Sequence, residues 1–239
     1  MIIDCISDFH GNYPELEGGD LLIVAGDLTA RDTEDEYAAF DEWLWQQNYK
    51  KIIIIAGNHD NGLQYPERIF RDGVLWTKGD YLCDSGTEFS YNIDGFPEED
   101  EKFLPNGKRT LKIWGSPWTK RFKGMNPHCM AFTCETEEEL AEKWATIPND
   151  IDILVTHSPP HGILDELVEE GYHVGSMALQ NVVRRIRPKL HVFGHVHESY
   201  GMCRPILEFI ALQGYPISVN ASHVNEYYEP VNKPIRVIL

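Results

Sequence analysis

The chain contains the stretch IIIIAGNHD at residues 52–60. Its first five residues are apolar and mostly β-branched, which is typical of a strand covered on both faces of a sheet. The last four are a glycine and three polar residues that favour a turn and also offer metal-binding atoms. The stretch therefore predicts a buried strand with polar side chains just beyond its carboxyl end.

The same pattern, a short apolar run followed at once by polar side chains, occurs at four other places in the chain. The polar parts are Asp8-Phe9-His10, Gly26-Asp27, Thr156-His157-Ser158 and Gly194-His195-Val196-His197. The apolar runs before them cover residues 2–6, 21–25, 151–155 and 190–193. In open α/β sheets, ligands collect beyond the carboxyl ends of the strands. We therefore expect the five clusters to meet around one point.

Helices are predicted between these strands. Thr33 with Glu36 and Thr136 with Glu139 match the capping-box pattern, and each pair opens a segment with helical spacing of apolar residues. These two helices are expected to end near Gln47 and Ile147, and a third is expected over residues 176–186. Paired strands are predicted over residues 87–93 and 110–114, separated by an exposed loop over 95–107, and closing strands over 217–219 and 235–239.

These elements predict a sheet-rich α/β layered fold. The chain has 239 residues and shows no internal repeat or linker, so residues 1–239 are expected to form a single domain. Its formal net charge of −17 argues against broad contact with long nucleic acids and with anionic membranes. A small anionic substrate stays compatible with this charge, because bound cations can reverse the local potential.

Cysteine usage and the amino terminus bear on location. The five cysteines have no disulfide-like rhythm, and no secretory leader precedes the first apolar run. The apolar runs are too short to span a bilayer. We therefore expect a cytoplasmic protein.

The clusters together predict a two-metal hydrolase site. Asp8 and His10 alternate around Phe9, so an extended backbone would point both side chains to one side, and His195 and His197 are spaced in the same way. The two carboxylate oxygens of Asp27 could bridge two cations, to which Asn58 and His157 could add an amide oxygen and an imidazole. Two cations about 3.5–4 Å apart can hold a hydroxide nucleophile and clamp a phosphate for in-line attack. Each cluster taken alone could be an ordinary polar turn; the five together favour the metal site.

Two adjacent residues are assigned a catalytic role. His59 could stabilise the charge of the transition state or protonate the leaving oxygen, with Asp60 as its orienting partner. Three further residues are candidate substrate contacts. They are Arg31 at the rim, Trp118 as a stacking surface or a packed wall, and His161 close to His157.

The five clusters resemble the calcineurin-like metallophosphoesterase superfamily, whose blocks run D-x-H, G-D, G-N-H-[DE], H and G-H-x-H. The resemblance implies a four-layer sandwich of two mixed β-sheets flanked by helices. It implies two divalent metal ions, Mn²⁺ first, with Fe or Zn²⁺ as alternatives. It assigns one ion to Asp8, His10, Asp27 and His197, and the other to Asp27, Asn58, His157 and His195.

A narrower resemblance is to the small metallophosphoesterase-domain-containing (MPPED-like) group, related to class III cyclic-nucleotide phosphodiesterases. The segments that carry it are residues 113–118, 157–165, 194–198 and 220–222. It implies a phosphodiesterase acting on small diesters such as cyclic nucleotides. The expected partner is thus a small phosphate ester, and the oligomeric state stays open.

Other functions are weighed against this one. Phosphoprotein phosphatases of the superfamily use a G-D-x-x-D-R-G block, which Ala30 and Asp32 break, and an arginine where this chain has Ala56. With at most one phosphate-clamping arginine, a dianionic monoester should be held less well, so a phosphomonoesterase is the second hypothesis. A nuclease acting on short oligonucleotides and a non-catalytic scaffold are further alternatives, although the chain retains every ligand that a scaffold would lose.

Overall fold

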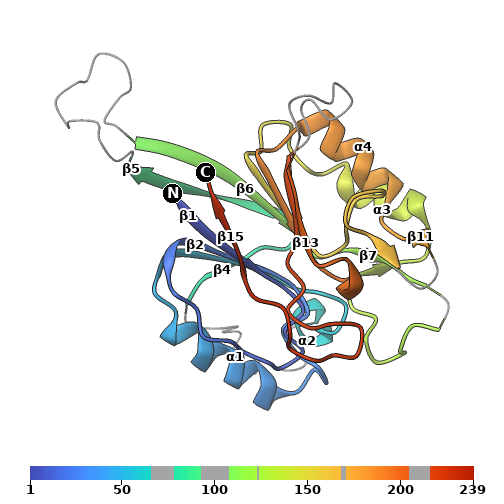
Figure 1. The fold of residues 1–239 in the computed structure, drawn as a ribbon. Coiled ribbons are helices and arrows are strands. Elements are labelled where there is room, and N and C mark those ends of the chain that lie inside the picture. Colours follow the sequence, from blue (N-terminus) through green and yellow to red (C-terminus); the bar gives the residue numbers. More distant parts are fainter. Residues whose placement is uncertain (66–77, 93–107, 123, 168–170, 205–215) are drawn as a thin grey trace.

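The structure is a computed structural model that describes residues 1–65, 78–92, 108–122, 124–167, 171–204 and 216–239. Within these residues, the strands form two large sheets and two small pairs (Figure 1). The loop predicted over residues 95–107 lies outside the described residues.

The first large sheet has five strands in the order β15-β1-β2-β3-β4. Their bounds are β15 Ile235–Ile238, β1 Ile2–Ile6, β2 Gly19–Ala25, β3 Tyr49–Ile55 and β4 Asp80–Tyr81. β1 to β4 run parallel to their neighbours, whereas β15 is antiparallel to β1. Because β1, β2 and β3 are parallel, the polar clusters that follow them lie at one edge of this sheet.

The second large sheet has six strands in the order β13-β14-β12-β9-β6-β5. Their bounds are β13 Gly201–Cys203, β14 Ile217–Asn220, β12 Leu190–Phe193, β9 Ile153–Thr156, β6 Lys108–Ser116 and β5 Ser85–Asn92. The four central strands are parallel and the two edge strands are antiparallel to their neighbours. The small pairs are β7 (Thr119–Lys120) with β8 (Thr133–Cys134) and β10 (Glu166–Leu167) with β11 (Tyr172–His173).

The predicted helices are present, and the predicted capping box is complete at Thr33. At Thr136 the side chain accepts the Glu139 N–H, whereas the Glu139 carboxylate accepts the N–H of Glu135. α1 (Glu34–Gln46) begins with the capping box of Thr33 and Glu36, and the Glu36 carboxylate also accepts the backbone N–H of Ala30. This contact ties the loop that follows β2 to the start of α1. The other helices are α2 (Asn61–Gln64), α3 (Glu137–Trp144), α4 (Met177–Ile186) and the short 3-10 helix η3 (His197–Ser199). Beyond Trp144, turn hydrogen bonds continue α3 as far as the predicted end.

Alternating residues of each strand face different layers. In β2, Leu21 and Ile23 face the core between the two sheets, whereas Leu22 packs under α1. In β9, Ile153 joins the same central core, and Leu154 faces α3 and α4. The order of layers is therefore helix, sheet, sheet, helices (Figure 1). The predicted four-layer sandwich of two mixed sheets is confirmed.

The two sheets come together where the polar clusters lie. Ser7, just beyond β1, forms an isolated bridge with Ser222, just beyond β14, so the carboxyl ends of strands from both sheets meet. This junction brings residues from the two ends of the chain together. Among the described residues, none of the helices has the length and apolar character needed to cross a membrane.

Candidate metal centre

Side chains from the five clusters converge at this junction in three overlapping groups of potential metal ligands. In each group the potential ligand atoms lie within 4.8 Å of one another. The first group is Asp8, His10 and His197, and the second is Asp27, His157 and His195. The third, His10, Asp27 and His59, shares one residue with each of the other two. Carboxylates and imidazoles that converge in this way suit divalent transition metals.

Asp27 belongs to the second group and also faces the first. Its Oδ2 atom is 3.7 Å from Nε2 of His10 and 3.4 Å from Nε2 of His157. Its Oδ1 atom accepts a hydrogen bond of 2.8 Å from the backbone N–H of His59, which fixes the carboxylate. One oxygen that faces imidazoles of both groups fits a carboxylate shared by two cations.

In the second group, hydrogen bonds hold the His157 ring in an orientation that suits metal binding. Nδ1 of His157 is 3.0 Å from the carbonyl oxygen of Ala25, which can only accept, so Nδ1 carries the hydrogen. Nε2 of His157 is 3.1 Å from Oδ1 of Asn58, whose amide nitrogen donates to the carbonyl of Cys129. A ring nitrogen and an amide oxygen thus face the same point.

The electrostatics at this point favour positive charge. Burial lowers the pKa of the His157 imidazole, but the adjacent Asp27 carboxylate outweighs it and raises the pKa to about 9. Burial, followed by repulsion from His157, lowers the pKa of His195 to about 3, so this imidazole is neutral at neutral pH. A neutral imidazole has the lone pair that a cation needs.

The first group is organised in a similar way. Nδ1 of His197 is 3.1 Å from the carbonyl oxygen of Asn225, so Nε2 has the free lone pair when this ring is neutral. That Nε2 lies 3.3 Å from Nε2 of His10 and 3.4 Å from Oδ1 of Asp8. Burial lowers the pKa of His10 to about 4, which keeps its ring neutral. The donor set of this group therefore also fits a divalent cation.

The backbone that presents these ligands differs from the prediction. Asp8 and His10 have positive φ angles of 53° and 44°, so they do not alternate along an extended strand. His195 has a φ of 70°, and His197 opens η3, so these two histidines turn apart and join different groups. The extended geometry was wrong because the chain turns sharply at each strand end. Left-handed backbone at residues other than glycine is strained and clusters at functional sites.

Glycines in the clusters allow the carboxylates to approach the backbone. A Cβ atom on Gly57 would lie 2.2 Å from Oδ1 of Asp27. One on Gly194 would lie 2.0 Å from Oδ2 of Asp8, which also accepts a 2.8 Å hydrogen bond from Ser222. Any larger residue at these positions would displace a potential ligand.

A family model described as calcineurin-like phosphoesterase matches residues 1–199. The chain belongs to the calcineurin-like phosphoesterase family. Metallophosphoesterase domain-containing protein 1 of Homo sapiens is 35% identical over 250 residues, which cover 98% of this chain and 70% of that protein. The UPF0046 protein K07C11.7 of Caenorhabditis elegans is 31% identical over 236 residues, covering 97% of this chain and 72% of that protein.

A solved structure, that of TT1561 of Thermus thermophilus, superimposes with a TM-score of 0.54 at 15% identity. The match covers 92% of this chain and 88% of that one, and it supports the fold alone. The predicted family and MPPED-like resemblance are confirmed by the sequence matches. This phosphoesterase is therefore a metal-dependent phosphoester hydrolase, and its Asp and His groups are candidate ligands.

His59 lies beside the candidate metal ligands of this phosphoesterase, but Asp60 does not orient it. Nδ1 of His59 is 3.3 Å from the carbonyl oxygen of Ala30 and 3.3 Å from Sγ of Cys129. The buried Asp60 carboxylate instead accepts the backbone N–H groups of Leu28, Thr29 and Gly57. The proposed pairing was wrong because Asp60 turns inward and joins the loop after β2 to the loop after β3. Burial, then repulsion by Asp27, raises the pKa of Asp60 to about 7.

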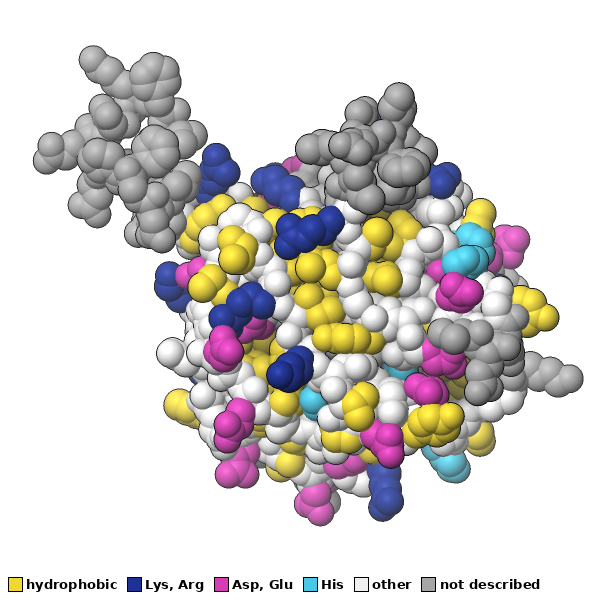
Figure 2. All heavy atoms as spheres, viewed as in Figure 1, with side chains coloured by type: hydrophobic (Ala, Val, Ile, Leu, Met, Phe, Trp, Pro, Cys, Tyr) yellow, Lys and Arg dark blue, Asp and Glu magenta, His cyan; other side chains and the backbone are white. Residues whose placement is uncertain are grey.

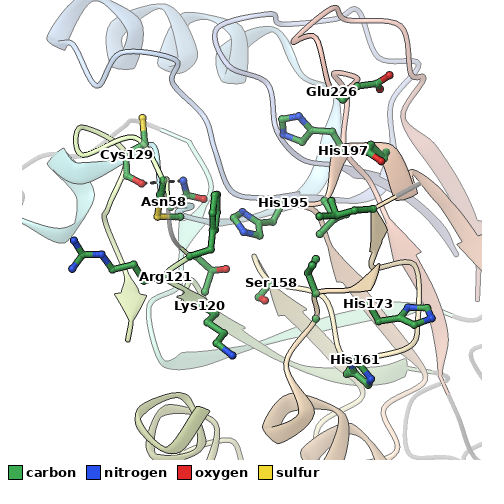
Figure 3. A pocket seen from close by; sticks show the side chains of 18 of the residues that line it. Asn58, Lys120, Arg121, Cys129, Ser158, His161, His173, His195, His197 and Glu226 are labelled. Carbon is green, nitrogen blue, oxygen red and sulfur yellow. Dashed lines mark hydrogen bonds between the residues drawn. The ribbon is translucent and has the colours of Figure 1, made fainter. Parts of the chain in front are cut away.

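A cavity of about 950 Å³ opens over the centre of this phosphoesterase, a size that fits a small ligand. In Figure 3, Asn58 and His195 lie on one side of it, with His161 and His173 on the opposite wall. His161 thus lies where a substrate contact was predicted. Arg31 is exposed and is not among the lining residues.

Trp118 does not line the cavity either. Its Nε1 donates a 2.6 Å hydrogen bond to Asp84, its ring packs edge-to-face on Phe132, and Lys143 lies 3.7 Å from the ring centroid. The packed-wall alternative for Trp118 therefore describes its surroundings, and the stacking role was wrong.

The sequence did not single out several residues that contact the centre. Cys129 contacts both Asn58 and His59, Asn225 contacts His197, and the ring of Tyr228 packs against His10. All three belong to irregular segments whose course depends on distant contacts. Neither a motif nor the apolar periodicity of the sequence pointed to any of the three.

Proposed function

We propose that this phosphoesterase is a binuclear-metal-dependent phosphodiesterase that hydrolyses small diesters such as cyclic nucleotides. The position of Asp27 carries the proposal, since its Oδ2 atom faces imidazoles of both ligand groups. Mn²⁺ is the proposed ion, and the same nitrogen and oxygen ligands also suit Fe and Zn²⁺. When bound, the two cations would supply an activated water and neutralise charge on the phosphate.

His59 is proposed as the group that protonates the leaving oxygen. It lines the cavity, and its backbone N–H is fixed on Asp27, so the ring is held next to the centre. Because its Nδ1 faces the Ala30 carbonyl oxygen, Nε2 is the atom left to transfer a proton. A positioned imidazole of this kind typically contributes about 10²–10⁴-fold to a rate.

The charges around the cavity support a diester over a monoester. Among the residues that the structure describes, the Lys and Arg side chains that line it are Lys120 and Arg121. Arg121 pairs with Glu135, and Nζ of Lys120 is 3.8 Å from Glu137. With their charge partly offset, these side chains favour a monoanionic diester over a dianionic monoester, which needs stronger charge-assisted contacts.

The surface supports a small substrate. On the face shown in Figure 2, Lys and Arg side chains are interspersed with acidic ones and form no broad basic patch. Together with the net charge of −17, this supports the proposal that long nucleic acids and anionic membranes are not partners. Cytoplasmic location stays part of the proposal.

Parallel hydrolysis of two artificial esters tests the diester preference. Metal-stripped protein is assayed with bis-p-nitrophenyl phosphate and with p-nitrophenyl phosphate, each with and without Mn²⁺. We expect activity only with Mn²⁺ and a kcat/KM for the diester at least about tenfold higher, equal to ~1.4 kcal/mol of activation free energy. A higher kcat/KM for the monoester would contradict the proposal and favour a phosphomonoesterase.

A further inference from the structure

Tyr228 places an exposed aromatic ring next to the metal centre. Its ring centroid is 4.8 Å from that of His10 and 5.3 Å from that of His197, in both cases edge-to-face. The residue lines the cavity and yet is 52% exposed. An aromatic ring with half its surface open beside a polar site offers an apolar contact to a ligand.

The turn that carries Tyr228 holds the backbone of this residue in a strained conformation. Tyr228 has a φ of 62°, a left-handed conformation that is rare for a bulky side chain. The side-chain oxygen of Asn225 accepts hydrogen bonds from the backbone N–H groups of Tyr227 and Glu229. The backbone carbonyl oxygen of Asn225 accepts one from the backbone N–H of Tyr228 and one from Nδ1–H of the His197 ring. One residue thus holds both the strained turn and a metal-ligand candidate. Strain that the surroundings maintain in this way indicates a functional position.

Phe122 provides a second ring at the other ligand group. Its centroid is 6.4 Å from the ring of His195, it is 56% exposed, and it lines the same cavity. Phe122 follows β7, whereas Tyr228 comes from the segment between β14 and β15. Two aromatic rings from unrelated segments therefore flank the two halves of the centre.

We propose that Tyr228 and Phe122 form an aromatic binding site for a planar group of the substrate, an aryl ring or a nucleobase, next to the phosphate. This inference rests on the proposed function, because the phosphate must lie at the metal centre. It transfers the stacking role from Trp118, which is packed, to two rings that are open to the cavity. Stacking of a base on an aromatic side chain tolerates many bases because each has a flat apolar face.

Calorimetric binding to Mn²⁺-loaded protein tests the inference without relying on turnover. The three probes are adenosine 5′-monophosphate, phenyl phosphate and ribose 5-phosphate, which share a phosphate and differ in the planar group. We expect adenosine 5′-monophosphate to bind roughly tenfold or more tightly than ribose 5-phosphate, within the range typical of base stacking on one aromatic residue. Phenyl phosphate distinguishes a site for any aryl ring from a site for a nucleobase. Tight binding of both planar probes indicates that any aryl ring is accepted, whereas tight binding of adenosine 5′-monophosphate alone indicates a nucleobase site.

Variants assign the preference to the two rings. Tyr228→Ala and Phe122→Ala should each reduce the preference for planar probes by about fivefold or more while ribose 5-phosphate binding stays unchanged. Tyr228→Phe should retain the preference because it keeps the ring. Tyr227→Ala is the matched control, since Tyr227 is the adjacent tyrosine, is 69% exposed and is not among the lining residues.

The outcomes separate this inference from the proposed function. If all three probes bind equally, or if the preference survives both alanine variants, the aromatic site is overturned although the phosphate site stands. If no probe binds although the Mn²⁺-loaded protein hydrolyses bis-p-nitrophenyl phosphate, the aromatic site alone is overturned. If that protein also hydrolyses no diester, the proposed function fails and the inference fails with it.

Discussion

Replacing Asp27 by alanine is expected to remove both metal ions and to lower kcat/KM for a diester by at least about 1,000-fold. The carboxylate faces imidazoles of both ligand groups, so its loss affects two sites at once. It also removes the acceptor of the His59 backbone N–H, which loosens the adjacent turn. Loss of a single oxyanion donor typically lowers a rate by about 10²–10³, and loss of a shared ligand should have a larger effect.

Metal analysis of purified protein, together with diester hydrolysis, checks this result. Asp20→Ala is the matched control, because Asp20 belongs to β2, the strand that precedes Asp27, but lies near its other end and pairs with Lys50. The control should keep its metal and its activity. Retention of one ion with near-normal activity in Asp27→Ala would contradict the shared-ligand role.

Replacing His59 by alanine is expected to lower kcat by about 10²–10⁴-fold while metal content stays near that of the unaltered protein. His59 lines the cavity beside the ligands, and its role in this proposal is proton transfer. The geometry also allows another role, since potential ligand atoms of His10, Asp27 and His59 lie within 4.8 Å of one another. Metal content therefore decides between a proton donor and a ligand.

His128→Ala provides the comparison for this variant. His128 is an exposed histidine of the nearby loop and is not among the lining residues. It should behave as the unaltered protein in both measurements. If His59→Ala loses metal in proportion to activity, His59 is a ligand and the proposed proton transfer is wrong.

The fold was accessible from the sequence because its central strands are apolar on both faces. Residues 52–55 all belong to β3 and alternate between the two cores, as expected for a strand that is covered on both faces. Strand ends were less accessible. β3 begins at Tyr49, before the predicted start at Ile52. Lys50 and Lys51 belong to the strand, and their side chains form ion pairs with Asp20 and Asp80. Polar residues at such ends do not differ from loop residues in sequence.

The residue types of the candidate centre were also accessible, but the way they are presented was not. Clusters placed just after buried parallel strands lie at one edge of each sheet, and the two sheets join at these edges, which brings Asp8 and His197 together. The left-handed turns at Asp8 and His195 could not be inferred, because spacing alone favoured an extended backbone. The partner of Asp60 was missed for a related reason, since its contacts come from a loop about thirty residues away.

Contacts made by irregular segments were the least accessible. Tyr228 reaches His10 because of a turn held by Asn225, and Cys129 reaches His59 across 70 residues. Neither contact follows from hydrophobic periodicity, which describes only regular elements. Substrate choice is expected to depend on such segments, which is why the sequence pointed to Trp118 and to neither of the two exposed rings.

The most direct test is titration of metal-stripped protein with Mn²⁺ while hydrolysis of bis-p-nitrophenyl phosphate is followed. If two cations share Asp27, activity should rise with added Mn²⁺ and reach its plateau at two ions per chain, with two bound ions at the plateau. Full activity at one ion per chain would contradict the binuclear centre. Protein that binds no Mn²⁺ would also contradict it and would favour a non-catalytic scaffold.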